Sequence, residues 1–171
     1  MCIRDRVEGV QAVILVPSRE LALQIEQVFK SMNTGFTIMS CYGGRPAMDE
    51  HRTMKGIRPS VIVGTPGRMN DHLEKLNFDA AVVNLLVIDE FDKCLEFGFQ
   101  EEMAAVIGKL PNLRRRFLLS ATDTEEIPRF TQRNAATDEI LILIVAYQPD
   151  NSHTAYGFRH THYRQDCSLR Q

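Results

Sequence analysis

Short apolar runs alternate along this chain with longer segments in which apolar residues recur at helical spacing. The runs predict β-strands at residues 11–16, 37–42, 60–63, 85–88, 116–119 and 140–145. Between them, the spacing predicts helices within residues 21–32, 47–54, 66–76, 103–110 and 125–134. Strands that alternate with helices need crossover connections. The pattern therefore predicts an α/β fold with a mostly parallel sheet covered by helices on both faces.

Two of the expected helices show an apolar face clearly enough to predict which residues pack on the sheet. In the first helix this face contains Leu21, Ile25, Val28, Phe29 and Met32, and in the third it contains Met69, Leu73 and Leu76. The fourth helix ends at Pro111, because a helix interior does not accommodate proline.

The two ends of the chain do not follow this alternation. We interpret residues 1–10 as an unstructured leader, and the charged residues 1–6 as sequence of foreign origin. Residues 11–146 form the expected domain. Residues 147–171 are polar and begin with a turn-like segment at residues 149–152, so we expect a linker or tail there. His160, His162 and Cys167 fall in this tail, where we expect no structure and no metal site.

Composition limits the class of protein. The chain has 171 residues, 44% of them hydrophobic, which suits one globular domain. A net charge of −2 gives no general attraction for nucleic acid, so any such binding has to come from local arrangements. The four cysteines are scattered, which indicates free, mostly buried thiols in a reducing compartment. No apolar run is long enough to span a bilayer, and we expect a cytoplasmic protein.

Polar clusters follow the expected strands directly. They are Pro17-Ser18-Arg19-Glu20, Gly43-Gly44, Thr65-Pro66-Gly67-Arg68, Asp89-Glu90-Phe91-Asp92 and Ser120-Ala121-Thr122. In an open parallel sheet, ligands bind outside the carboxyl ends of the strands. We therefore expect these clusters to share one edge and to form one extended site.

The clusters that contain arginine or glycine suit the binding of phosphate. Thr65 is a good helix N-cap, Pro66 suits the first helical position, and Arg68 adds a fork of donors beside a positive helix end. Ser18 and Arg19 repeat this logic, and Gly43-Gly44 can present backbone N–H groups. Taken singly, each segment is equally explained as an ordinary capped helix or a tight turn.

The acidic cluster suits magnesium. Asp89 would bind Mg²⁺, Glu90 would orient or deprotonate an attacking water, and Asp92 would take a nearby polar partner. The alternative is a solvated acidic turn that caps the next helix. Ser120 and Thr122 offer hydroxyl groups to Asp92 or its neighbours, or else cap a helix of their own.

Read in order, these clusters resemble the motif series of the DEAD-box RNA helicases. The segment from Pro17 to Ala22 is similar to motif Ia, Gly43-Gly44 to the GG element, and the segment from Thr65 to Arg68 to motif Ib. The segment from Asp89 to Asp92 is similar to motif II, and Ser120-Ala121-Thr122 to motif III. One such motif is weak evidence, whereas five in order are strong. The resemblance covers residues 11–146.

This resemblance implies the first RecA-like domain of a two-lobed, ATP-dependent enzyme that separates short RNA duplexes. By resemblance, Asp89 and Glu90 serve the hydrolysis of Mg²⁺-bound ATP, and Asp92, Ser120 and Thr122 couple it to strand separation. The residues that would lie along the RNA backbone, without sequence preference, are Pro17, Ser18, Arg19, Gly43, Gly44, Thr65, Pro66, Gly67 and Arg68. We expect a monomer in which this domain would face a second lobe.

The chain departs from the family pattern in several places. Phe91 stands where the family has alanine, and Ser18 replaces the more usual threonine. No G-x-x-x-x-G-K-[ST] segment occurs, because the only Gly-Lys pair, Gly108-Lys109, is followed by Leu110. We therefore expect a fragment, truncated at both ends, that hydrolyses little ATP alone. The main alternative is a RecA-like module that binds RNA or protein without catalysis, and a DNA helicase is a weaker one.

Overall fold

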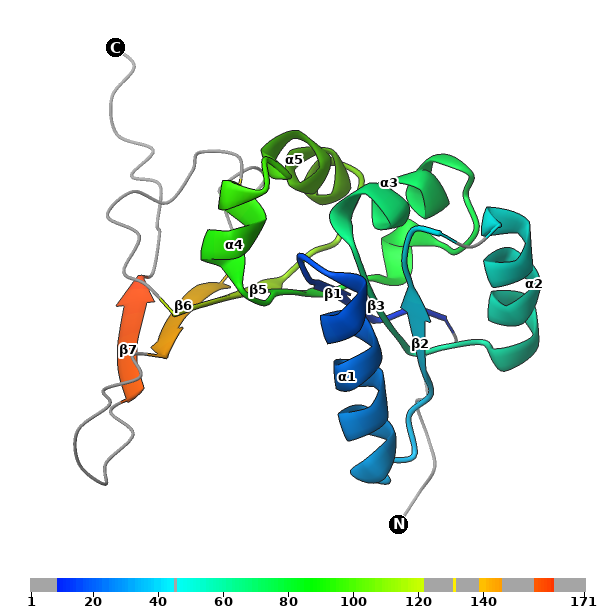
Figure 1. Ribbon diagram of the computed structural model, residues 1–171, viewed down its shortest axis with the longest axis horizontal. Helices are drawn as coiled ribbons and strands as arrows, with labels where there is room; N and C mark the ends of the chain where they lie inside the picture. The colour runs from blue at the N-terminus through cyan, green and yellow to red at the C-terminus, as the bar shows by residue number, and fades with distance from the viewer. Residues whose placement is uncertain (1–8, 45, 122–130, 132–138, 146–155, 162–171) are drawn as a thin grey trace.

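The chain is described here by a computed structural model, which covers residues 9–44, 46–121, 131, 139–145 and 156–161. Its elements are β1 (Ala12–Leu15), α1 (Arg19–Ser31), β2 (Ile38–Cys41), α2 (Ala47–Ile57), β3 (Val61–Gly64), α3 (Pro66–Glu74), the 3₁₀ helix η1 (Ala80–Val82), β4 (Leu85–Ile88), α4 (Phe91–Glu96), α5 (Gln100–Gly108), β5 (Arg115–Ser120), β6 (Glu139–Val145) and β7 (Tyr156–Thr161) (Figure 1).

The strands form one seven-stranded sheet in the order β2-β3-β1-β4-β5-β6-β7. Every pair is parallel except β6 with β7, which is antiparallel. Each predicted strand is present, with bounds that differ by a residue or two. The prediction of an α/β fold with a mostly parallel sheet is confirmed.

Alternate residues of β1, β2 and β3 point to two separate cores, as the pleat of a β-strand requires. On one face, Val13 and Leu15 of β1 pack with Ile62 of β3 and with buried residues of α3 and α5. On the other face, Val63 packs with Ala22 of α1. Figure 1 shows α1 on the opposite side of the sheet from α3, α4 and α5. The sheet is therefore the middle layer of three.

Two predicted helical faces extend too far. Val28 and Met32 on the first helix are 55% and 62% exposed, because the sheet covers only the side that carries Leu21, Ile25 and Phe29. In the third helix, Leu76 lies beyond the end of α3, has φ of 52° and is 83% exposed. The predictions that Val28, Met32 and Leu76 pack in the core were wrong.

Three elements were not expected from the sequence, and one of them is the 3₁₀ helix η1. The short helix α4 begins at Phe91, inside the acidic cluster, where we had considered only a turn or an approach to the next helix. Strand β7 pairs with β6 and contains His160, in a segment that we had interpreted as an unstructured tail. The helix predicted at residues 125–134 lies outside the described residues, apart from Thr131, and so do residues 1–8.

The described cysteines, Cys41 and Cys94, are free and buried, as the scattered cysteines predicted. Among the helices that the structure describes, none is long and apolar enough to cross a membrane.

The side chain of Phe91 packs into the core. Its side chain is 1% exposed and belongs to the larger of the two cores. We expect Phe91→Ala to lower the free energy of unfolding by about 3–5 kcal/mol, the usual loss when a buried ring leaves a cavity. Urea unfolding followed by circular dichroism measures this change. Phe36→Ala is the control, because Phe36 is 51% exposed, and a change of similar size there would contradict the assignment of Phe91 to the core.

Candidate functional site

The strands that precede the polar clusters end level with one another. Leu15, the last residue of β1, pairs with Gly64 of β3 and with Ile88 of β4. Gly64 in turn pairs with Cys41, the last residue of β2. Because these strands are parallel, the segments that follow them leave the sheet at one edge. The expectation of a shared edge is confirmed for these clusters.

Backbone hydrogen bonds continue the sheet for one residue into the clusters. Thr65 N–H donates to the carbonyl of Cys41 at 3.2 Å, and Asp89 N–H donates to that of Leu15 at 2.9 Å. Gly64 allows this closeness, because a Cβ atom there would lie 2.1 Å from the Cys41 carbonyl oxygen. The polar residues are therefore held by the sheet itself.

Residues from three of the predicted segments line one open hollow of about 620 Å³. Its lining consists of Arg19, Gly43, Thr65, Gly67, Arg68, Asp71 and Phe99. The first five were predicted from the sequence to contact RNA. Asp71 and Phe99 were not, although Asp71 lies one helical turn after Arg68 and Phe99 follows the acidic helix α4.

The start of α3 leaves space in this hollow. Thr65 occupies the N-cap position and Pro66 the first turn, as predicted, although Thr65 makes no side-chain capping hydrogen bond. Gly67 is exposed, and a Cβ atom there would meet no protein atom within 4 Å. The free N–H groups of a helix start favour an anion. The space beside them is therefore suited to a phosphate group.

The remaining predicted contact residues have other surroundings. The Ser18 hydroxyl accepts a hydrogen bond from Leu21 N–H at 3.2 Å and so caps α1. Pro17 and Pro66 are buried. Gly44 is exposed and has φ of 93°, a conformation that favours glycine. Contact with RNA stays a prediction for these residues, as it does for those that line the hollow.

The two arginines of the hollow differ in how they are held. Arg19 is exposed and pairs with its neighbour Glu20, with 3.2 Å between Nη2 and Oε1. Arg68 has a side chain only 13% exposed; its Nε lies 3.5 Å from Glu50 Oε2 and its Nη1 lies 3.7 Å from Asp71 Oδ2. Surface pairs contribute little to stability and rearrange easily. Arg68 is therefore the more firmly placed of the two cations.

The acidic cluster lies at the end of β4 on the same edge. Asp89 Oδ1 accepts a hydrogen bond from Glu90 N–H at 2.9 Å, and Glu90 pairs with Lys93, with 3.0 Å between Nζ and Oε1. Glu90 has φ of 48°, which is unusual for a residue with a side chain and costs roughly 1–3 kcal/mol. This strained backbone, just before the buried ring of Phe91, turns the chain from strand into helix.

Asp89 has the electrostatics of a cation ligand. Burial raises the pKa of its carboxyl above the ordinary value, and the charges of Glu90 and Asp92 raise it further. A divalent cation would relieve both effects, and oxygen ligands are those that Mg²⁺ prefers. The donor set at Asp89 therefore fits Mg²⁺. The neighbouring Cys94 does not, because burial raises the pKa of its thiol to about 12.

The hydroxyl cluster is only partly described. Ser120 is buried at the end of β5, which pairs with β4 so that Leu118 lies opposite Ile88. This register places Ser120 beside the start of the acidic cluster. Thr122 lies outside the described residues, so its predicted role stays a prediction.

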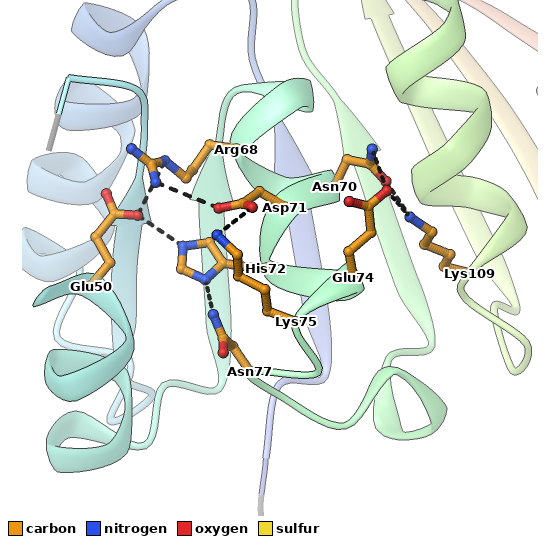
Figure 2. A network of polar contacts seen from close by, with 9 residues as sticks. All are labelled: Glu50, Arg68, Asn70, Asp71, His72, Glu74, Lys75, Asn77 and Lys109. Carbon is orange, nitrogen blue, oxygen red and sulfur yellow. Dashed lines mark hydrogen bonds and ion pairs between the residues drawn. The ribbon is translucent and has the colours of Figure 1, made fainter. Parts of the chain in front are cut away.

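Sequence reasoning missed a buried polar cluster beneath the hollow. Cys41, Glu50 and His72 are all buried, and their possible metal-ligating atoms lie within 4.8 Å of one another. Figure 2 shows Glu50 and His72 facing each other, with Arg68 above them. A signal was present in the sequence, because residue 72 falls on the same helical face as Met69 and Leu73 and is nevertheless polar.

A second hollow, of about 600 Å³, lies at the opposite end of the strands. Its lining includes Thr37, Arg58 and Ser60, which precede or begin β2 and β3. It contains none of the predicted contact residues. The two hollows are therefore separate features of the fold.

Comparison with known proteins agrees with this arrangement. The DEAD/DEAH box helicase family matches residues 1–130, a match that begins before the predicted domain boundary at residue 11. The chain is 35% identical over 157 residues to the ATP-dependent RNA helicase DeaD of Klebsiella pneumoniae, covering 87% of this chain and 24% of that protein. It is 33% identical over 141 residues to CshA of Listeria monocytogenes, covering 81% and 27%. The chain thus spans about a quarter of these relatives.

Solved structures give the same assignment. Mss116p bound to single-stranded RNA and AMP-PNP superposes with a TM-score of 0.70 at 31% identity, over 82% of this chain and 30% of that one. A hypothetical ATP-dependent RNA helicase from Sulfolobus tokodaii superposes with a TM-score of 0.67 at 26% identity, over 78% and 40%. The sheet with its two helical layers is a RecA-like domain, and the chain belongs to the DEAD/DEAH box helicase family.

Proposed function

We propose that this chain is the RNA-contacting part of the first RecA-like lobe of an ATP-dependent RNA helicase. The observation that carries the proposal is the hollow of about 620 Å³, in which residues from the ends of β1, β2 and β3 meet. Relatives described as ATP-dependent RNA helicases, and a solved relative bound to single-stranded RNA, support it.

The RNA backbone would bind through its phosphates. The Arg68 side chain would donate to one phosphate, while N–H groups in the first turn of α3 donate to the same group or the next. Arg19 would add a second, mobile cation on the rim. None of these groups reads the edge of a base, so the binding would be independent of sequence.

The acidic cluster would hold Mg²⁺ with the nucleotide. Asp89 is the expected ligand, through water, and Glu90 would orient the water that attacks the terminal phosphate. Bound Mg²⁺ would neutralise charge on the phosphates. Asp92, with Ser120 and Thr122, would couple the ATP site to the RNA site. Phe99 would link the two sites physically, because it follows α4 and lines the hollow.

Activity of the whole protein would need parts beyond the segment that these relatives share with the chain. We propose that a phosphate-gripping segment and a second lobe complete the ATP site, that the protein acts as a monomer, and that it works in the cytoplasm. The absence of a G-x-x-x-x-G-K-[ST] pattern from the sequence supports the proposal that another segment binds the phosphates of ATP.

The first test concerns RNA binding. Arg68→Ala should weaken binding of a fluorescein-labelled uridine oligonucleotide roughly tenfold at low salt, and should reduce the slope of log K against log[salt] by about 0.7, the value for one phosphate contact on a single strand. Fluorescence anisotropy measures both. Arg114→Ala removes the same charge at the opposite edge of the sheet and is the control. Equal losses in the two variants would refute a localised site.

The second test concerns ATP. We expect no RNA-stimulated phosphate release from the 171-residue chain, because its sequence has no G-x-x-x-x-G-K-[ST] segment to hold the phosphates of ATP, and positioning supplies about 7–11 kcal/mol of such catalysis. A protein extended in both directions by its own coding sequence should be active. Turnover by the chain alone would overturn this expectation, and none in either form would favour a non-enzymatic module.

The third test concerns Asp89. Burial holds the pKa of its carboxyl above the ordinary value, so at neutral pH the folded state contains an ionised group that it disfavours. Asp89→Asn should therefore raise the free energy of unfolding at neutral pH. This gain in the free energy of unfolding should vanish when the pH is below the pKa of Asp89 in the unfolded chain, because the carboxyl is then protonated in both states. As the pH rises from there, the gain should grow until the pH exceeds the pKa of Asp89 in the folded state.

Urea unfolding at several pH values measures this difference. Glu20→Gln is a control of opposite sign, because a backbone hydrogen bond lowers the pKa of Glu20. A gain for Asp89→Asn that stays the same at every pH would show that ionisation is not its cause.

A further inference from the structure

Two segments that line the hollow are joined beneath it by one buried carboxylate. These are the glycine turn that follows β2, beginning at Tyr42, and the start of α3, which carries Arg68. Glu50 of α2 lies under both and is only 4% exposed. A buried carboxylate is costly unless donors surround it. The donors that Glu50 has found are therefore informative.

Each oxygen of Glu50 meets a different part of the site. Oε1 accepts a hydrogen bond from the backbone N–H of Tyr42 at 3.2 Å. Oε2 lies 2.8 Å from His72 Nε2 and 3.5 Å from Arg68 Nε. The Glu50 carboxylate thus holds the backbone just before Gly43-Gly44 and also the Nε end of the Arg68 guanidinium.

His72 is held in one tautomer by its second partner. The side-chain amide nitrogen of Asn77 lies 2.7 Å from His72 Nδ1. An amide nitrogen only donates, so Nδ1 is the acceptor and the ring proton is on Nε2, pointing at Glu50. His72 and Glu50 are buried, so the contact between them is shielded from water, whereas Asn77 is half-buried at the lining of the second hollow (Figure 2).

Arg68 is held from two sides. Glu50 approaches its Nε, and Asp71, one turn further along α3, approaches its Nη1 at 3.7 Å. Asp71 is itself paired with Lys75 at 2.6 Å. A guanidinium held in this way keeps its position at the rim of the hollow with little loss of rotamer freedom when phosphate binds.

The same atoms do not favour a metal ion. A zinc ion would need the Cys41 thiolate and an unprotonated His72 Nε2. Burial raises the pKa of the Cys41 thiol to about 12, and the charge of Glu50 adds to this effect. The Nε2 proton is engaged with Glu50, and the Arg68 cation lies beside it. The cluster is therefore a hydrogen-bonded brace.

We propose that Glu50, locked by His72 and Asn77, is a positioning residue for the RNA-phosphate site. It sets the spacing between the Gly43-Gly44 turn and Arg68, so that backbone amides and guanidinium address the RNA backbone together. This inference rests on the proposed function of the hollow. It adds a role for α2 and for the buried face of α3, neither of which lines the hollow.

The test compares two isosteric substitutions. Glu50→Gln removes the charge that holds Arg68 and places an amide N–H₂ where two donors now point. Glu74→Gln makes the same chemical change on the other flank of α3, where Glu74 is exposed and paired with Lys109 at 2.9 Å (Figure 2). Binding of the labelled uridine oligonucleotide to the full chain is measured as a function of salt.

We expect Glu50→Gln to weaken binding roughly fivefold to tenfold and to reduce the salt slope by about 0.7, as Arg68→Ala does. Glu74→Gln should stay within about twofold of the unmodified chain, as expected for a surface change. In a Glu50→Gln, Arg68→Ala double variant the loss of affinity should be smaller than the sum of the two single losses, because both changes act on the Arg68 contact.

A second pair of variants separates positioning from folding. In His72→Gln, the amide nitrogen can replace Nε2 as donor to Glu50, so RNA affinity should be retained. In His72→Leu the donor is lost, and affinity should fall as in Glu50→Gln. Hydrogen exchange at the Tyr42 amide, followed by NMR, should be slow in the first variant and fast in the second.

The outcomes distinguish the two claims. If Arg68→Ala leaves RNA binding unchanged, the proposed RNA site is wrong, and the positioning role fails with it. If Arg68→Ala weakens binding while Glu50→Gln does not, or tightens it, the RNA site stands and the positioning role is refuted. Tighter binding would show that Glu50 competes with phosphate for the arginine.

Discussion

The functional edge of this domain depends on hydrogen bonds that continue the parallel sheet one residue past its strand ends. The Asp89 N–H donates a hydrogen bond to the Leu15 carbonyl, and the Thr65 N–H donates one to the Cys41 carbonyl, before each segment turns into a helix. These bonds fix the backbone of an acidic cluster and of an arginine-bearing helix start relative to each other. The close approach at Gly64, which a side chain would prevent, belongs to the same constraint. The positions of the polar groups follow from the sheet.

Two carboxylates near this edge, the buried Glu50 and the half-buried Asp89, have different surroundings. Glu50 is surrounded by donors from Tyr42, His72 and Arg68, so its charge is satisfied within the protein. Asp89 receives one backbone hydrogen bond and faces the acids Glu90 and Asp92. The donors around Glu50 stabilise the fold, whereas the acids around Asp89 favour the binding of a cation there. That contrast distinguishes Glu50, a structural carboxylate, from Asp89, the proposed cation ligand.

Most of the fold could be predicted from the sequence, because strand and helix periods are local signals. The parallel pairing followed from the alternation of elements, and the shared edge followed from the pairing. Leu76 was misjudged because its spacing fits the helix, while the chain leaves the helical conformation before reaching it. The strand β7 was missed because Tyr156–Thr161 is polar and is specified only by its partner β6.

The individual residues of the hollow could be predicted from the sequence, but the contacts that hold them together could not. Arg19, Gly43, Thr65, Gly67 and Arg68 carry local patterns that mark them, and the structure brings them to one hollow. Glu50, His72 and Asn77 carry no such pattern, because their roles arise only when α2 and α3 pack side by side. Polar residues on an otherwise apolar helical face were the single hint, and spacing alone does not identify their partners.

The pairing of Arg68 with two acids also has a kinetic side. Its charge is balanced at close range by Glu50 and Asp71, and the chain as a whole has a net charge of −2. Long-range attraction, which speeds the encounter of basic proteins with nucleic acid, is therefore weak here. RNA would associate at an ordinary rate, without electrostatic acceleration, and the lifetime of the complex would depend on how slowly the RNA backbone dissociates. In the proposed function, the affinity for RNA would therefore depend mainly on the dissociation rate.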